Sequence, residues 1–208
     1  MNPIDVLPNP SLQDRGEISR IFLDLGVKTF QGACQHVKDM PYASNSDSTK
    51  SLLLFAEGHG TCATKHGAIA LLAQEQTLPI TKSLGFYRLN DTIVTGVSQI
   101  LAGYGLSFIP QIHCFLEYQN YRVELTEGNC NGKNQTIDDY DFVVSTEPDI
   151  TFEEKQACYL AHLRRYFELA PELKAVGEEK VLEILTECDR QLKYRCSIMA
   201  DQLATSAV

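Results

Sequence analysis

The order of hydrophobic patterns along the chain predicts an α+β fold in which a buried helix packs on an antiparallel sheet. Residues 62–76 follow a helical pattern that is apolar on most of its circumference after the first turn, which is typical of a helix surrounded by protein. Four runs rich in β-branched and aromatic residues then predict strands: 80–89, 108–115, 121–125 and 140–145. Because these strands are grouped between helices instead of alternating with them, the pattern indicates α+β and not α/β.

Two helices and a loop are expected before the buried helix. Ser11 is the expected N-cap of a helix over Leu12–Leu25 that ends at Gly26. A shorter helix is expected at Thr29–Lys38. The segment Tyr42–Lys50 is polar and rich in turn-forming residues, so we expect a surface loop there.

After the first predicted strand, Asp91 is expected to cap a helix at about Thr92–Ala102. The two runs that follow are separated by Gln119 and Asn120, which predicts a hairpin with its turn at these two residues. The sheet would then be completed by the run at 140–145.

The C-terminal part is predicted to be helical throughout. A capping box begins it at Thr151, and Pro171 and Gly177 divide it into two or three helices. We therefore expect a catalytic core at 1–150 and a helical extension at 151–208 that packs on the core. Its amphipathic pattern would also suit a lid or pairing with a second subunit in a homo-oligomer.

Composition narrows the class of protein. A chain of 208 residues with 44% hydrophobic residues can bury a real core, and a formal net charge of -9 argues against nucleic-acid and anionic-membrane partners. The N-terminus has no basic start followed by an apolar run, and no apolar stretch is long enough for a membrane helix. We therefore expect a cytoplasmic protein whose seven cysteines are reduced.

Cys62 is the residue most indicative of function. It follows the segment GHGT at 58–61 and opens the predicted buried helix. A thiol at a helix N-terminus meets the positive end of the helix dipole and unpaired N–H groups, and both favour the thiolate. The glycines would let the backbone approach a substrate, and the Cys62 N–H could form part of an oxyanion hole. Gly60 and Thr61 are therefore predicted to bind substrate, although this pattern also fits a packed structural cysteine.

His113 is the predicted base. If the hairpin turns at 119–120, His113 lies opposite Thr126, and Glu124 is its diagonal neighbour on the same face, within reach of the ring. His113 would take the proton of Cys62 and later give a proton to the leaving group. Glu124 would fix the tautomer of the ring and stabilise the imidazolium.

Two stretches resemble the transglutaminase-like superfamily. EGHGTCATKHGAIALLAQE resembles its cysteine segment, and HCFLEYQNYRVELT resembles its histidine strand followed by its acid strand. The similarity covers about residues 51–126, and it implies a papain-like core and a triad of Cys62, His113 and Glu124. The chain departs from the family's pattern in having Glu as the acid, a short interval from His to acid, and no Trp after the His. Three other acids are alternatives for the third member: Asp138, Asp139 and Asp141.

Three further side chains are predicted to bind substrate. Lys65 stands one turn into the helix, where it could lower the thiol pKa or hold a substrate carboxylate, or else form a structural ion pair. His66 lies four residues after Cys62 and therefore on the same helix face. Gln111 precedes His113 by two residues and shares its face of the strand.

The sequence thus predicts a cofactor-free enzyme whose cysteine attacks an amide or ester of a small molecule or peptide. Water as acceptor makes it an amidase, peptidase or deamidase, and an amine makes it an amide-forming transferase. No calcium loop supports calcium-dependent cross-linking. Two alternatives stay open: a catalytically inactive peptide-binding module of the same fold, and a metal-dependent hydrolase that uses Cys62, His66 and His113.

Overall fold

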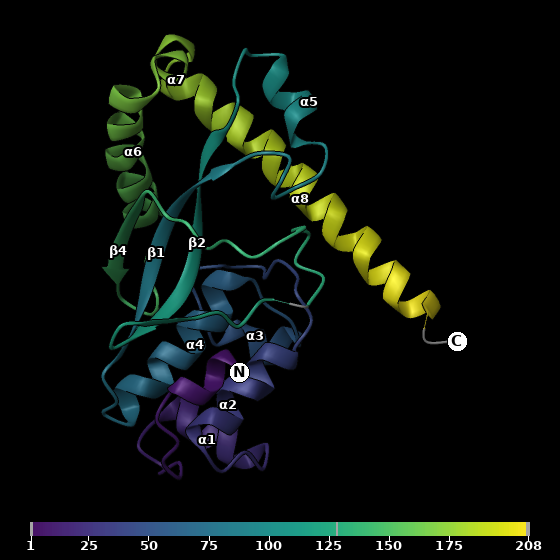
Figure 1. The fold of residues 1–208 in the computed structure, drawn as a ribbon. Helices are drawn as coiled ribbons and strands as arrows, with labels where there is room; N and C mark the ends of the chain where they lie inside the picture. The colour runs from purple at the N-terminus through teal and green to yellow at the C-terminus, as the bar shows by residue number, and fades with distance from the viewer. Residues whose placement is uncertain (1, 128, 207–208) are drawn as a thin grey trace. The chain divides into compact units, whose positions relative to one another are not determined.

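A computed structural model, which describes residues 2–127 and 129–206, confirms the α+β class (Figure 1). Within this part of the chain there are eight α-helices and one antiparallel sheet of four strands in the order β3-β2-β1-β4. The strands span β1 (Ile80–Leu89), β2 (Ile109–Tyr118), β3 (Tyr121–Val123) and β4 (Phe142–Thr146). All four predicted strands are therefore confirmed, with shifts of a few residues at their ends.

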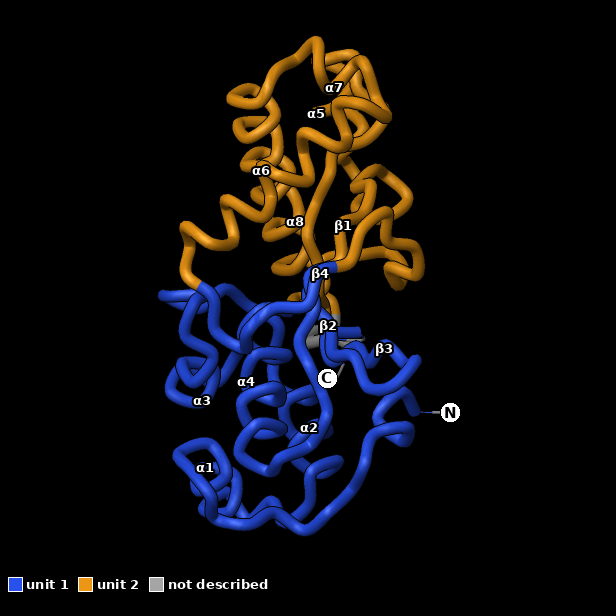
Figure 2. Tube along the Cα trace, turned by 90° about the vertical axis from the view of Figure 1, so that its left-hand side faces the viewer, with its two compact units in different colours: residues 1–84, 114–129, 144–150 blue, residues 85–113, 130–143, 151–208 orange. Residues whose placement is uncertain are grey.

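The chain divides into two compact units (Figure 2). Unit 1 contains residues 1–84, 114–129 and 144–150. Unit 2 contains residues 85–113, 130–143 and 151–208. Two segments before residue 150, 85–113 and 130–143, group with the C-terminal helices, and a functional boundary at that residue stays a prediction.

Unit 1 is built around α4, which packs against the three helices before it. The three are α1 (Glu17–Asp24), α2 (Phe30–Asp39) and α3 (Leu53–Glu57), preceded by a 3-10 turn, η1 (Pro3–Val6), and α4 itself spans Cys62–Glu75. Ala68, Ile69 and Leu72 of α4 are fully buried in the core of this unit. The prediction of a buried helix that starts at Cys62 is confirmed.

The expected start of α1 is wrong. Ser11 is not an N-cap, because it pairs with Thr29 in an isolated β-bridge and keeps the chain extended there. The cap comes instead from Glu75 at the end of α4, whose carboxylate oxygens accept the N–H groups of Ile18 and Ser19 at 3.1 and 2.8 Å. A carboxylate at this position satisfies donors that the first turn leaves unpaired and also favours the helix dipole.

The hairpin forms with the predicted turn. Its pairs are Leu116 with Val123, Glu117 with Arg122 and Tyr118 with Tyr121, so Gln119 and Asn120 make the turn. This is the register from which His113 was placed opposite Thr126. However, β3 ends at Val123, so the regular ladder stops before Thr126.

In unit 2, α5 packs on α8, and α7 packs on both α6 and α8. Their bounds are α5 (Val97–Ala102), α6 (Phe152–Leu169), α7 (Pro171–Val176) and α8 (Glu178–Ser206). The capping box at Thr151 and the breaks at Pro171 and Gly177 are confirmed. None of the helices described combines the length and the apolar character needed to cross a membrane.

Helix α5 begins later than predicted, but Asp91 still caps it. One oxygen of the Asp91 carboxylate accepts the N–H groups of Gly96 at 2.8 Å and Ser98 at 3.1 Å. Hydrogen bonding from Ser98, by its side chain first and then by its N–H, together with the Gly96 N–H, holds the pKa of Asp91 below its usual value. The residues between the cap and the helix form a turn, which explains the delayed start.

Candidate active-site residues in the two units

Cys62 is the first residue of α4 and is half-buried. The turn before it is fixed by side chains: the Thr61 N–H donates to Thr64 Oγ1 at 3.0 Å, and Thr64 Oγ1 donates to Asn45 Oδ1 at 2.7 Å. A Cβ added to Gly60 would lie only 2.6 Å from Thr64 Oγ1, so a larger residue does not fit there. The chain therefore enters the helix in one defined conformation at the cysteine.

Three of the other six thiols are buried, and the remaining three are half-buried. None of the seven cysteines, all of which the structure describes, is in a disulfide. Burial is the main cause that raises the thiol pKa of four of them, to about 12 for Cys188 and about 11 for Cys196, and upward also for Cys34 and Cys158. Cys114 is buried as well. Because the thiolate is the reactive form, these five positions are poorly suited to nucleophilic chemistry.

His66 is fully buried and links α4 to the segment after β3. Its Nδ1 donates to the Cys62 carbonyl oxygen at 2.7 Å, and its Nε2 accepts the Leu125 N–H at 2.9 Å. The ring must therefore be neutral with its proton on Nδ1, since an imidazolium has no lone pair with which to accept an N–H. His66 holds the backbone of Cys62 in place, a role that the sequence did not indicate.

Glu124 lies beside His66 in unit 1. Its Oε1 accepts both the N–H and the hydroxyl of Thr126 at 2.6 Å, and it is 3.5 Å from His66 Nε2. Because His66 Nε2 already accepts the Leu125 N–H, the short approach of Glu124 is not a hydrogen bond to this ring. The structure thus groups Cys62, His66 and Glu124 around the first turns of α4.

Lys65 is also fully buried. Its ammonium donates to the backbone carbonyls of Lys38, at 3.1 Å, and Met40, at the end of α2. Burial lowers the pKa of Lys65 to about 8, and the nearby carboxylates of Glu124 and Asp39 oppose this effect. These contacts give Lys65 a structural role, and its predicted contact with substrate stays a prediction.

His113 lies on β2 within unit 2 and is buried. Its Nδ1 is 3.2 Å from the ammonium nitrogen of Lys133, which is buried too. Nothing in the sequence indicated Lys133, because it stands in a loop rich in Asn and Gly. Gln111, predicted to bind substrate, donates from Nε2 to Asp189 of α8 at 2.6 Å.

The predicted triad draws on both units. Cys62 and Glu124 belong to unit 1 and His113 belongs to unit 2. Each unit supplies a defined environment for its own residues, and the pairing of the Cys62 thiol with the His113 ring stays a prediction.

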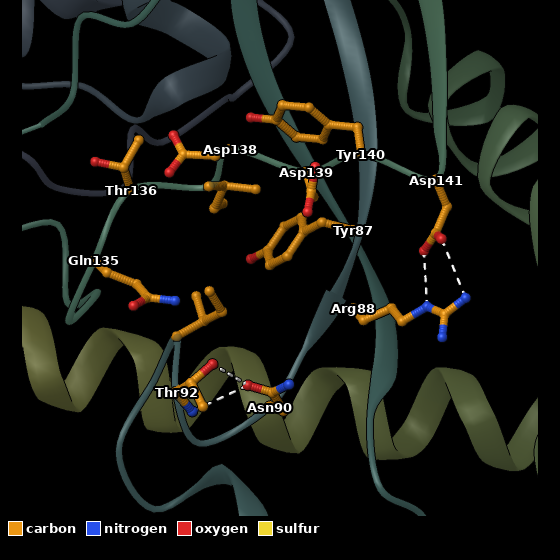
Figure 3. A pocket seen from close by; sticks show the side chains of 12 residues that line it. Tyr87, Arg88, Asn90, Thr92, Gln135, Thr136, Asp138, Asp139, Tyr140 and Asp141 are labelled. Carbon is orange, nitrogen blue, oxygen red and sulfur yellow. Dashed lines mark hydrogen bonds and ion pairs between the residues drawn. The ribbon is translucent and has the colours of Figure 1, made fainter.

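A pocket of about 630 Å³ lies in unit 2, between the end of β1 and the loop that leads to β4 (Figure 3). Its polar and aromatic lining includes Tyr87, Tyr140, Asp138, Asp139 and Asp141. Arg88 also lines it but is neutralised, because its guanidinium donates twice to Asp141, at 3.0 and 3.1 Å. The remaining charge is negative, so the pocket suits a polar or cationic ligand. The three aspartates proposed as alternative triad acids all line this pocket.

The described residues provide few suitably grouped ligands for a metal ion. Within 2–127 and 129–206, no three His, Cys, Asp or Glu side chains are grouped so that they could hold one. His66 has both ring nitrogens in hydrogen bonds within the protein, so it could bind a metal only by losing one of them. This geometry disfavours the alternative of a hydrolase that uses Cys62 and His66 as ligands.

Comparisons of the chain with protein-family models, with curated proteins and with solved structures gave no match. The resemblance to the transglutaminase-like superfamily therefore stays a prediction that rests on the residues of the two stretches.

Proposed function

We propose that the protein is a cysteine-dependent acyl-transfer enzyme of transglutaminase-like type that acts on an amide or ester bond. The observation that carries the proposal is the place of Cys62, half-buried at the first position of a 14-residue helix. The first-turn N–H groups of a helix have no carbonyl partner within it, and they stabilise an adjacent anion. Cys62 occupies the one position of this kind among the cysteines described.

In the proposed reaction the Cys62 thiolate attacks the carbonyl carbon, and a carbon–sulfur bond forms. First-turn N–H groups of α4 stabilise the negative oxygen that develops. The carbon–nitrogen or carbon–oxygen bond then breaks, and His113 gives the leaving group its proton. A thioester remains on Cys62, and water resolves it in hydrolysis or an amine resolves it in transfer.

The surroundings of Cys62 support this use because they are fixed before any substrate arrives. His66 anchors the Cys62 carbonyl, and the bond between Thr61 and Thr64 anchors the residue before it. Catalytic groups gain most when their geometry does not have to be ordered during the reaction.

The proposal is tested by alkylation with iodoacetamide at several pH values, with each labelled cysteine identified by mass spectrometry. We expect Cys62 to react fastest of the seven thiols below about pH 7, since only a stabilised thiolate reacts there. His113→Gln should slow this labelling. Cys130→Ser, which removes a half-buried thiol that lies in a loop and not in a helix, is the matched control and should leave it unchanged. Equal rates at all accessible thiols would defeat the proposal.

A binding module without catalysis is the second candidate function. The pocket of unit 2 favours it, because the pocket is large enough for a small ligand and carries carboxylates that would hold an amine. This candidate expects an unreactive Cys62. It also expects the double variant Asp138→Asn, Asp139→Asn to lose affinity for cationic peptides in a titration, whereas Cys62→Ser keeps it.

A further inference from the structure

We propose that Lys133 is a positioning residue that fixes the tautomer of His113 and keeps its ring neutral at neutral pH. The two side chains come from different segments of unit 2, with Nζ of Lys133 3.2 Å from Nδ1 of His113. Both residues are at least nine-tenths buried, at 9% and 3% exposure, so water competes little with this contact. The tautomer and charge of the His113 ring depend on this contact itself, whereas their consequence for catalysis rests on the proposed function.

The chemistry of the two groups sets the direction of the hydrogen bond. An ammonium has three donors and no acceptor, so Lys133 donates and His113 Nδ1 must offer its lone pair. A neutral ring that accepts at Nδ1 carries its proton on Nε2. A second proton would place an imidazolium beside an ammonium, and a like charge at this distance lowers the pKa of the ring.

The loop holds Lys133 in this place through several hydrogen bonds. The Lys133 N–H donates to Asn131 Oδ1 at 3.0 Å, and the N–H of Asn134 donates to the Ile93 carbonyl at 2.8 Å. The lysine therefore approaches His113 from an ordered backbone and not from a free tail.

Three titratable groups lie around the pair. Cys196 of α8 and Cys130 of the loop lie near Lys133, and the pKa of Cys196 stays raised to about 11 by burial although Lys133 opposes the rise. Asp189 of α8 accepts a hydrogen bond from Gln111. No carboxylate among the residues described forms an ion pair with Lys133, and the contact with His113 places its positive charge beside the ring.

This arrangement changes how the proposed reaction would move its protons. The leaving amine takes the proton from His113 Nε2 while Lys133 passes a proton from Nζ to Nδ1, so the ring stays neutral. During hydrolysis of the thioester, water gives a proton to Nε2 and Nδ1 returns one to Lys133. All protons are then restored, and the sum is amide plus water giving acid plus amine. Lys133 would thus donate a proton to His113 Nδ1 in the first step and accept it again in the second.

The test is long-range proton–nitrogen NMR of the ¹⁵N-labelled full chain, with His113→Gln to assign the ring. We expect the Nε2–H tautomer for His113. His162 is the internal reference with the opposite tautomer, because its Nδ1 donates to the Cys158 carbonyl at 2.8 Å. An Nδ1–H tautomer for His113 in the wild type would overturn the inference, whether or not any variant folds.

A pH titration adds a result that a merely structural lysine would not give. Lys133→Met should raise the pKa of His113 by about one unit, whereas Lys133→Arg keeps the charge and should leave it low. Lys82→Met is the control: it removes another buried lysine, bonded to the Pro148 carbonyl in unit 1, and should not move His113. Equal His113 titrations in Lys133→Met and wild type would overturn the inference.

The labelling of Cys62 separates this inference from the proposed function. With an Nε2–H tautomer and an unreactive Cys62, the role of Lys133 stands and the enzyme proposal fails. With a reactive Cys62 and an Nδ1–H tautomer, the enzyme proposal stands and the role of Lys133 fails.

Discussion

Replacing Lys65 with methionine should remove a pH dependence of stability that the structure assigns to one side chain. Lys65 is fully buried, and burial lowers its pKa from 10.5 to about 8. Between these values the unfolded chain holds the proton and the folded protein does not, so the free energy of unfolding rises with pH. The difference of 2.5 pH units (10.5 - 8) multiplied by 1.36 kcal/mol gives about 3 kcal/mol. Below about pH 8 both states are protonated, and the cost of burying the charge is present in full.

The measurement is urea unfolding followed by circular dichroism between about pH 7 and 10.5, with a reductant to protect the thiols. Other groups titrate in this range, but they are shared by both proteins and cancel in the difference. The stability of wild type relative to Lys65→Met should rise by about 3 kcal/mol across the range. Lys50→Met, at a solvent-exposed lysine, is the control and should show no such rise.

A flat difference between wild type and Lys65→Met would refute the reasoning. It would mean that the ammonium keeps its ordinary pKa and is therefore hydrated. Lys65 would then be available for the substrate contact predicted from the sequence. The absolute stability of the variant is a poorer guide, because the lost charge and the lost donor to the Met40 carbonyl act in opposite directions.

Three smaller changes test other parts of the structure by the same unfolding method. His66→Leu should cost about 1–3 kcal/mol, because the buried N–H of Leu125 loses its acceptor, and an unchanged stability would contradict the bond. Gly67→Ala should also lower the free energy of unfolding, by about 1–3 kcal/mol, since the new Cβ would lie 1.9 Å from Ser51 Oγ. This cost exceeds the gain from the better helix propensity of Ala. A gain in stability would show that Ser51 moves freely. Asp141→Asn should cost about 1–2 kcal/mol, because it weakens both a partly exposed ion pair with Arg88 and the hydrogen bond from the hydroxyl of the buried Tyr166, and an unchanged stability would contradict these contacts.

The helices, strands and turns that could be predicted are those determined by residues close together in the sequence. The helix from Cys62 was recognised because its apolar residues follow a helical period, and β1 was recognised with its observed bounds because it is rich in β-branched and aromatic residues. The hairpin turn at 119–120 followed from two polar residues between such runs. In each case residues a few positions apart carry the information.

What could not be predicted depends on partners far away in the sequence. The start of α1 is set by Glu75, and the state of the His66 ring is set by the N–H of Leu125. Lys133 approaches His113 across a separation of 20 residues, from a loop without any pattern. Such contacts arise from tertiary packing, which a period or a propensity does not encode.

The two accounts of His113 predict opposite shifts of its ring pKa, and this shift can be measured. A carboxylate such as Glu124 as its orienting partner would favour the imidazolium and raise the pKa of the ring. The ammonium of Lys133 favours the neutral ring and lowers that pKa, and it also requires the proton on Nε2. In the first account the proposed base is a cationic ring, and in the second it is a neutral ring that donates from Nε2 and accepts from a lysine. Because a ring with a raised pKa protonates above about pH 6.5 and a ring with a lowered pKa protonates below it, the titration of this one histidine decides which group governs the proposed base.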